Sequence, residues 1–189
     1  MAMIEITWHG RGGQGAKTAS QFLAEAALEL GKHIQAFPEY GPERAGAPMR
    51  AYTRISDEPI YVHSSITAAD IVIVIDPTLL GVVDVTEGLK QDGVLLVNTD
   101  RSIQDVRHKA NFTKGKVGVV DATRIALETL KLPMPNMPML GAFIKVNPIV
   151  SLDGIIDIVK KKFQKKLGEE KTLANIEGIK RAYNELRLG

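Results

Sequence analysis

The chain begins with a two-residue alternation of polar and apolar side chains that gives way to a helical composition. Residues 3–8 place Ile4, Ile6 and Trp8 at alternate positions, a pattern typical of a β-strand with one buried face. Residues 16–30 are rich in Ala, Leu and Glu, which favour a helix. The first predicted unit is therefore a strand, a short connection and a helix.

Strands and helices alternate along the rest of the chain. Further strands are predicted over residues 32–37, 49–55, 94–98 and 117–120, and helices over residues 77–89, 122–130, 141–146, 151–163 and 169–188. Residues 70–76 are apolar on both faces, which indicates a central parallel strand covered on each side. We predict an α/β fold: one Rossmann-like, doubly wound domain over residues 1–189, with a mainly parallel sheet, helices on both faces and helices at its C-terminal end.

Two irregular regions interrupt this alternation. Residues 38–48 are dense in Pro and Gly and predict a long loop, of a length that is usually either functional or disordered. The strand at 49–55, a turn at residues 57–59 and a short strand at Ile60–Val62 predict a hairpin inserted after the second strand. Residues 132–139 hold three prolines and three methionines. That segment is either an irregular connector in which Met fills gaps or an adaptable contact surface.

The connection between the first strand and helix is Gly10-Arg11-Gly12-Gly13-Gln14-Gly15, which we call the glycine loop. Its glycines let backbone N–H groups crowd the N-terminus of the helix, where the partial positive charge favours an anion. We therefore expect the loop to bind a phosphate. The alternative is a tight turn that binds nothing, with glycines that only allow the helix to pack closely on the strand.

The loop matches one nucleotide-binding signature and fails another. Its glycines satisfy G-x-G-x-x-G, and Glu39 after the second strand is a candidate ribose-binding acid. This match keeps a stand-alone NAD-dependent dehydrogenase as an alternative. A P-loop requires Lys directly after the last glycine, whereas Ala16 stands there and Lys17 follows one residue later. The sequence therefore does not predict a P-loop.

Composition narrows the class of protein. Of the 189 residues, 44% are hydrophobic and 24% charged, and the net charge of +2 is too small to indicate a nucleic-acid surface. No apolar run approaches the roughly 18 residues of a membrane span, and Glu5 interrupts the N-terminal apolar run, so we expect a cytoplasmic protein without a membrane contact. The absence of cysteine excludes disulfides, thiolate nucleophiles and cysteine-ligated iron–sulfur clusters in this sequence.

The polar side chains near the loop suit phosphate binding better than bond breaking. The candidates are Arg11, Gln14, Lys17, Glu43, Arg44 and Arg50. Arg44 follows the second strand and is expected at the same sheet edge as the glycine loop, where a guanidinium can bind a phosphate with two hydrogen bonds or only stiffen its own loop. No metal-ligand spacing and no catalytic constellation are predicted, because the four histidines are scattered.

Three segments, in order, resemble the gamma subunit of 2-oxoacid:ferredoxin oxidoreductases. They are the glycine loop, Tyr40-Gly41-Pro42-Glu43-Arg44, and residues 136–142 with the sequence Asn-Met-Pro-Met-Leu-Gly-Ala. The similarity covers nearly the whole chain. In its length and over residues 37–55, the chain is most similar to the gamma subunits of four-subunit pyruvate:ferredoxin oxidoreductases. Ala45-Gly46-Ala47 stands where many relatives carry Arg-Gly-Gly, which removes a positive charge.

The resemblance implies a hetero-oligomeric enzyme that converts pyruvate, coenzyme A and oxidised ferredoxin to acetyl-CoA, CO2 and reduced ferredoxin. Its partners would be alpha, beta and delta subunits, with thiamine diphosphate and magnesium on alpha and beta and iron–sulfur clusters on beta and delta. This chain would carry no redox centre and would be inactive alone.

In this family the gamma chain corresponds to the domain proposed to hold coenzyme A. The implied coenzyme-binding residues are Gly10, Arg11, Gly12, Gly13, Gln14, Gly15, Lys17, Tyr40, Glu43 and Arg44. The alternative within the same complex is a purely structural subunit whose loop contacts other chains and binds no small molecule.

Overall fold

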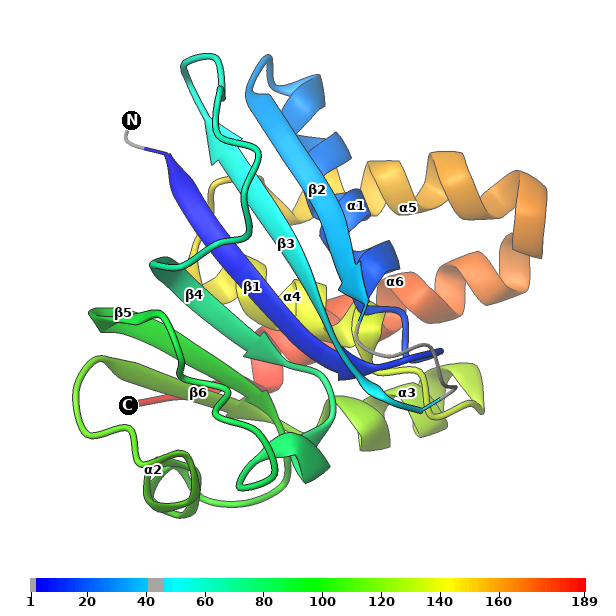
Figure 1. Ribbon diagram of the computed structural model, residues 1–189. Coiled ribbons are helices and arrows are strands. Elements are labelled where there is room, and N and C mark those ends of the chain that lie inside the picture. Colours follow the sequence, from blue (N-terminus) through cyan, green and yellow to red (C-terminus); the bar gives the residue numbers. More distant parts are fainter. Residues whose placement is uncertain (1–2, 41–45) are drawn as a thin grey trace.

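The computed structural model describes residues 3–40 and 46–189 and shows a mixed α/β fold around one seven-stranded sheet (Figure 1). The strands are β1 (Ile4–Arg11), β2 (His33–Tyr40), β3 (Pro48–Ser56), β4 (Ala69–Val74), β5 (Leu89–Asn98), β6 (Lys116–Val120) and β7 (Arg187–Leu188). The helices are α1 (Ala16–Glu29), α2 (Ile103–Ala110), α3 (Ala122–Leu130), α4 (Asn136–Val146), α5 (Leu152–Leu167) and α6 (Glu169–Glu185), with a short 3-10 helix at Pro77–Leu79.

The strands follow the order β2-β3-β1-β4-β5-β6-β7 across the sheet. β1, β4, β5 and β6 pair in parallel, and β2 runs in the same direction because β3 is antiparallel to both β1 and β2. Only β3 and β7 oppose the other five described strands. The predicted mainly parallel α/β sheet is therefore confirmed, with the apolar β4 at its centre.

The two faces of the sheet are covered differently. Helices α1, α3, α4, α5 and α6 cover one face, where Trp8 packs 6.4 Å from Phe143 between ring centroids (Figure 1). The other face is covered by α2, through Val106, and by the irregular segments 57–68 and 77–88. Helices lie on both faces, as predicted, but on the second face irregular chain does most of the covering.

The predicted helix over residues 77–89 is wrong beyond its first turn. The side chain of Asp76 caps the short 3-10 helix by accepting a backbone N–H at 2.8 Å. Gly81 and Gly88 then adopt φ values of +83° and +73°, in the left-handed region that a continuing α-helix cannot contain. The two glycines thus turn this segment into irregular cover for the sheet.

The predicted hairpin is wrong in its second strand. Residues 57–68 are described throughout and contain no strand; β3 instead pairs with β2 on one side and β1 on the other. The loop predicted over residues 38–48 is wrong at both ends, because β2 continues to Tyr40 and β3 begins at Pro48. The inserted antiparallel strand therefore lies between the first two parallel strands.

Other helices agree with the sequence except at their ends, and one was not predicted. α4 begins at Asn136, with Met137 and Met139 both buried, so these two methionines fill the core, whereas Met134 before the helix is exposed. α2 was missed although it has a capping box: the Ser102 hydroxyl accepts the Asp105 N–H at 3.1 Å and the Asp105 carboxylate accepts the Ser102 N–H at 3.2 Å. Among the described helices, none has the length and apolar character needed to cross a membrane.

Candidate functional site

The carboxyl ends of β1, β4, β5 and β6 meet at one edge of the sheet, at the lower right of Figure 1. From β1 the chain passes through α1 to β2 on one side, and from β3 it passes to β4 on the other. In open α/β sheets, ligands bind where the chain changes side in this way. The glycine loop lies at this point.

The glycine loop joins β1 directly to α1. Gly13 and Gly15 have φ values of +94° and +81°, which residues with side chains rarely adopt. No side chain caps α1 and no acidic residue lies in its first turn. The partial positive charge at this helix end is therefore not compensated within the helix itself.

The loop also packs closely on the start of α4. A Cβ atom on Gly15 would lie 2.4 Å from the Asn136 Nδ2 atom, and the Asn136 amide donates to the Gly15 carbonyl at 3.4 Å. Glycine is thus required at this position by both its backbone conformation and its neighbour. Asn136 was not among the predicted site residues, although it lies in the third segment that carries the resemblance.

The side chains of Arg11 and Gln14 bond to the protein itself. The Gln14 amide donates to the Asp76 carboxylate at 2.6 Å, and its oxygen accepts the Arg11 N–H at 2.7 Å. The Arg11 guanidinium lies 3.1 Å from Asp76 Oδ2 and donates to the Thr78 hydroxyl at 3.0 Å and the Gly46 carbonyl at 3.1 Å. These two predicted side chains therefore fix the shape of the loop.

Asp76 is the centre of this network. Its carboxylate also accepts the N–H and the hydroxyl of Thr78, at 2.8 and 2.6 Å. Burial acts to raise the pKa of Asp76, but hydrogen bonds from Thr78 and Gln14 and the charge of Arg11 outweigh burial and hold that pKa below its usual value. The carboxylate is consequently ionised at neutral pH and ties the loop to the end of β4.

His9 directly precedes the loop and is only 3% exposed. Burial, assisted by the positive charge of Arg50, lowers the pKa of His9 to about 4 against the opposing charges of Asp84 and Glu87. The imidazole is therefore neutral at pH 7. Arg50, a further candidate from the sequence, is paired with Glu87 at 2.8 Å.

The other predicted residues are described to different extents. Lys17 is exposed in the first turn of α1 and forms no ion pair with any residue that the structure describes. Glu43 and Arg44 lie outside the described residues, so their predicted role is untested. For Tyr40 only the backbone, as the last residue of β2, is described.

Glu39 does not lie where a dinucleotide-binding fold needs its ribose-binding acid. Because β3 separates β1 from β2, Glu39 stands two strands from the glycine-loop strand, which is about 10 Å at the usual strand spacing. Its carboxylate accepts hydrogen bonds from the hydroxyls of Tyr52 and Ser65. The Glu39 carboxylate thus bonds to other side chains of this chain, away from the glycine loop, which removes support from the dehydrogenase alternative.

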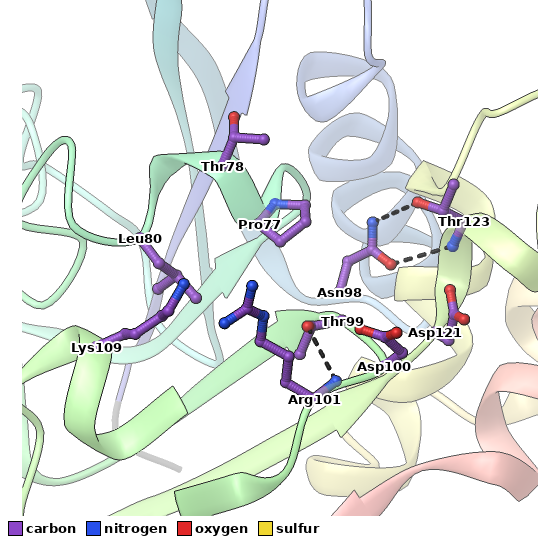
Figure 2. A pocket seen from close by; sticks show the side chains of 10 residues that line it. All are labelled: Pro77, Thr78, Leu80, Asn98, Thr99, Asp100, Arg101, Lys109, Asp121 and Thr123. Atoms are coloured by element: carbon purple, nitrogen blue, oxygen red, sulfur yellow. Dashed lines mark hydrogen bonds between the residues drawn. The ribbon is translucent and has the colours of Figure 1, made fainter. Parts of the chain in front are cut away.

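A second feature of this edge is a cavity of about 470 Å³ at the ends of β4, β5 and β6, which we call the strand-end pocket (Figure 2). It is lined by Pro77, Thr78, Leu80, Asn98, Thr99, Asp100, Arg101, Lys109, Asp121 and Thr123. Asn98 shapes it by donating to the Ile75 carbonyl and the Thr123 hydroxyl, each at 2.8 Å. None of these residues was a candidate site residue from the sequence, although Pro77, Thr99 and Asp121 each directly follow a predicted strand.

Comparison with known proteins gives one consistent result. Residues 5–185 match the family model described as pyruvate ferredoxin/flavodoxin oxidoreductase. The chain is 55% identical over 184 residues to pyruvate synthase subunit PorC of Thermotoga maritima, covering 97% of this chain and 95% of that protein. It is 48% identical over 183 residues to the pyruvate/ketoisovalerate oxidoreductases common subunit gamma of Thermococcus kodakarensis, covering 97% of each. The crystal structure of the Thermotoga maritima subunit matches with a TM-score of 0.90 at 49% identity, over 100% of this chain and 99% of that one.

Proposed function

Because the chain belongs to the pyruvate ferredoxin/flavodoxin oxidoreductase family and is a subunit of such an oxidoreductase, we propose that its glycine loop binds coenzyme A for the complex. The complex would convert pyruvate, coenzyme A and oxidised ferredoxin to acetyl-CoA, CO2 and reduced ferredoxin. Alpha, beta and delta subunits would be its partners in the cytoplasm.

In this proposal the redox chemistry belongs to the partners. Thiamine diphosphate with magnesium, on the alpha and beta subunits, would supply the chemistry of decarboxylation, and iron–sulfur clusters on beta and delta would accept the electrons. The present sequence contains no cysteine to ligate a cluster. The contribution of this chain is then to hold and orient the thiol substrate, which is catalysis by positioning.

The observation that carries the proposal is the uncapped N-terminus of α1 beneath an exposed loop. The helices α2, α3 and α5 begin with a side-chain cap, and α6, which has none, carries two acidic residues in its first turn. α4 also begins without a side-chain cap, but its first turn is buried. α1 begins at a glycine, has no acidic residue in its first turn and follows an exposed loop. Backbone N–H groups at such an end bind phosphate oxygens. The anionic part of coenzyme A provides those oxygens.

The space and charge around the loop agree with this assignment. Gly12 and Gly13 are exposed, and a Cβ atom on Gly13 would meet no other atom within 4 Å, so the loop has open space above it. The exposed Lys17 adds a positive charge in the first turn of the helix. Since Arg11 and Gln14 bond to Asp76 and its neighbours, backbone N–H groups and Lys17 are the groups that would bind the phosphate.

The internal network around Asp76 also favours a second candidate function. A loop whose two polar side chains bond only to the protein is what a purely structural subunit needs. That alternative predicts no effect of the loop on coenzyme affinity, so the two candidates differ in a measurable quantity.

The test is a Gly13→Val substitution in the assembled complex, with Gly31→Val as the matched control. Both glycines have positive φ, +94° and +77°, and open space at the Cβ position, but Gly31 lies at the opposite end of α1. We expect Gly13→Val to raise the KM for coenzyme A by about tenfold or more, through the loss of about 1.4 kcal/mol of binding. The KM for pyruvate should not change.

The control separates binding from backbone strain. Gly31→Val should carry a similar strain and leave the KM for coenzyme A unchanged. Equal KM values in both variants and the wild type would contradict the binding role and support the structural one. Affinity purification of this chain from native extract tests the partners: three further subunits with iron and thiamine should co-purify, and recovery of the chain alone would contradict membership in that complex.

A further inference from the structure

The strand-end pocket contains two positive charges that no described residue neutralises by an ion pair. Arg101 follows β5 and Lys109 lies at the end of α2, and both side chains are exposed. Figure 2 shows the guanidinium and the ammonium group pointing toward one another at the end of the pocket beside Leu80. Two convergent cations in a concave site are a binding arrangement for a phosphate.

The charges that face this pair do not cancel it. The Asp105 carboxylate on α2 interacts electrostatically with both cations and offsets part of their charge, but it accepts the N–H and hydroxyl of Ser102 and forms no ion pair with either cation among the described contacts. Asp121, at the opposite end of the pocket, accepts the Arg124 N–H at 2.9 Å and lies 3.6 Å from its guanidinium. The cationic end therefore remains free for an anionic ligand.

The opposite end of the pocket has a different chemistry. Asp100 and Asp121 both line the pocket, and Figure 2 shows them at the end where Thr123 lies, away from Lys109. Carboxylates accept hydrogen bonds from sugar hydroxyls, as the acid of a dinucleotide-binding fold does for ribose. A ligand that satisfies both ends carries a phosphate and a hydroxyl on one small ring, which describes a phosphorylated ribose.

One residue that lines the pocket, Thr78, also bonds to the glycine loop. Thr78 lines the pocket, and its hydroxyl accepts from Arg11 and donates to the same Asp76 that holds Gln14. The loop follows β1 and Arg101 follows β5, two strands away, so the two lie about 10 Å apart across the sheet at the usual strand spacing. A nucleotide with two phosphate groups can extend between them.

From these contacts we propose that the strand-end pocket binds the 3′-phosphorylated ribose of the coenzyme. Arg101 and Lys109 bind the 3′-phosphate, and the carboxylates of Asp100 and Asp121 face the ribose hydroxyl. This inference rests on the proposed function, because it assigns a second part of the same ligand. It makes Arg101 and Lys109 the residues that distinguish coenzyme A from its 3′-dephospho form.

The experiment combines a change in the ligand with a change in the protein. The KM for coenzyme A and for 3′-dephospho-coenzyme A is measured in the assembled complex for the wild type, Arg101→Gln and Lys109→Gln. Lys165→Gln, an exposed cation of α5, is the matched control. We expect the wild type to prefer coenzyme A by about tenfold, the size of one charge-assisted contact, and each pocket variant to lose most of that preference.

The expected loss comes entirely from a higher KM for coenzyme A. The KM for the dephospho form should stay unchanged in the pocket variants, and Lys165→Gln should behave as the wild type. An equal rise for both ligands, or a preference that survives both substitutions, overturns the assignment. So does a lower yield of assembled complex for Arg101→Gln, since the pocket would then hold a residue of a partner subunit.

Failure of this inference can be distinguished from failure of the proposed function. Gly13→Val acts on the loop and should raise the KM for both ligands by the same factor. If it has no effect while the pocket variants still lose the preference, the loop role is wrong and the pocket role stands. If Gly13→Val raises both KM values while the preference persists in the pocket variants, the loop role stands and the pocket role is wrong.

Discussion

The glycine loop and the strand-end pocket lie at the same edge of the sheet but differ in what their polar side chains contact. In the loop, Arg11 and Gln14 bond to Asp76 and its neighbours. In the pocket, Arg101 and Lys109 form no ion pair with the described residues. Side chains of the first kind hold the protein in shape, and side chains of the second kind are available for a ligand. Substitutions in the two regions should therefore affect different quantities.

The largest difference is expected at Asp76, which holds the loop to β4. Asp76→Ala should lower the free energy of unfolding by about 3 kcal/mol, because it leaves the Gln14 amide and the Arg11 guanidinium without their acceptor. Asp84→Ala is the control: Asp84 accepts the N–H and hydroxyl of Thr86 in the same local pattern but is exposed. It should cost about 1 kcal/mol. Equal losses in urea denaturation would contradict the network.

Lowering the pH should reduce the stability of the folded protein through His9, which directly precedes the glycine loop. The folded pKa of about 4 lies below the unfolded value of 6.5, so between these values the unfolded chain binds a proton that the folded chain does not. Stability therefore falls as the pH drops from about 6.5 to about 4, by about 3 kcal/mol in total. His9→Gln should remove this part of the pH dependence in denaturation measured at pH 7 and pH 4. Parallel curves for the two proteins would show that His9 is protonated normally.

The smallest expected difference in the free energy of unfolding is the one between substitutions of Arg11 and Arg101. Arg11→Gln should lower the free energy of unfolding by about 1 kcal/mol through the lost contacts to Asp76 and Thr78. Arg101→Gln should change it by less than about 0.5 kcal/mol, as is usual for an exposed side chain that forms no ion pair or hydrogen bond with the described residues. Thermal unfolding of the two variants side by side measures the difference. An Arg101 variant as unstable as the Arg11 variant would contradict the distinction between the regions.

The sequence predicted those parts of the fold that depend on local pattern. The glycine loop between β1 and α1 and the apolar β4 both follow from residues that are neighbours along the chain. The prediction of a helix over residues 77–89 was wrong because Gly81 and Gly88 adopt positive φ values, which the residue composition of the segment does not reveal. The capping box of α2, with Ser102 and Asp105 three residues apart, is a local signal that is visible in the sequence.

What the sequence could not predict depends on contacts between distant segments. The insertion of β3 between β1 and β2 is a choice of pairing partner, and it is the reason that Glu39 does not serve the loop. The contact of Asn136 with Gly15 joins residues 121 positions apart. The strand-end pocket exists only because β4, β5 and β6 end side by side, so no single segment carries its pattern.

Hydrogen–deuterium exchange of the assembled complex, with and without coenzyme A, tests the central claim most directly. If this chain holds the coenzyme, the ligand should slow amide exchange in residues 12–18 of the loop and first helical turn, and in residues 98–109 of the pocket. The C-terminal helix α6 should exchange at the same rate in both states. Protection confined to other subunits, with no change anywhere in this chain, would contradict the account.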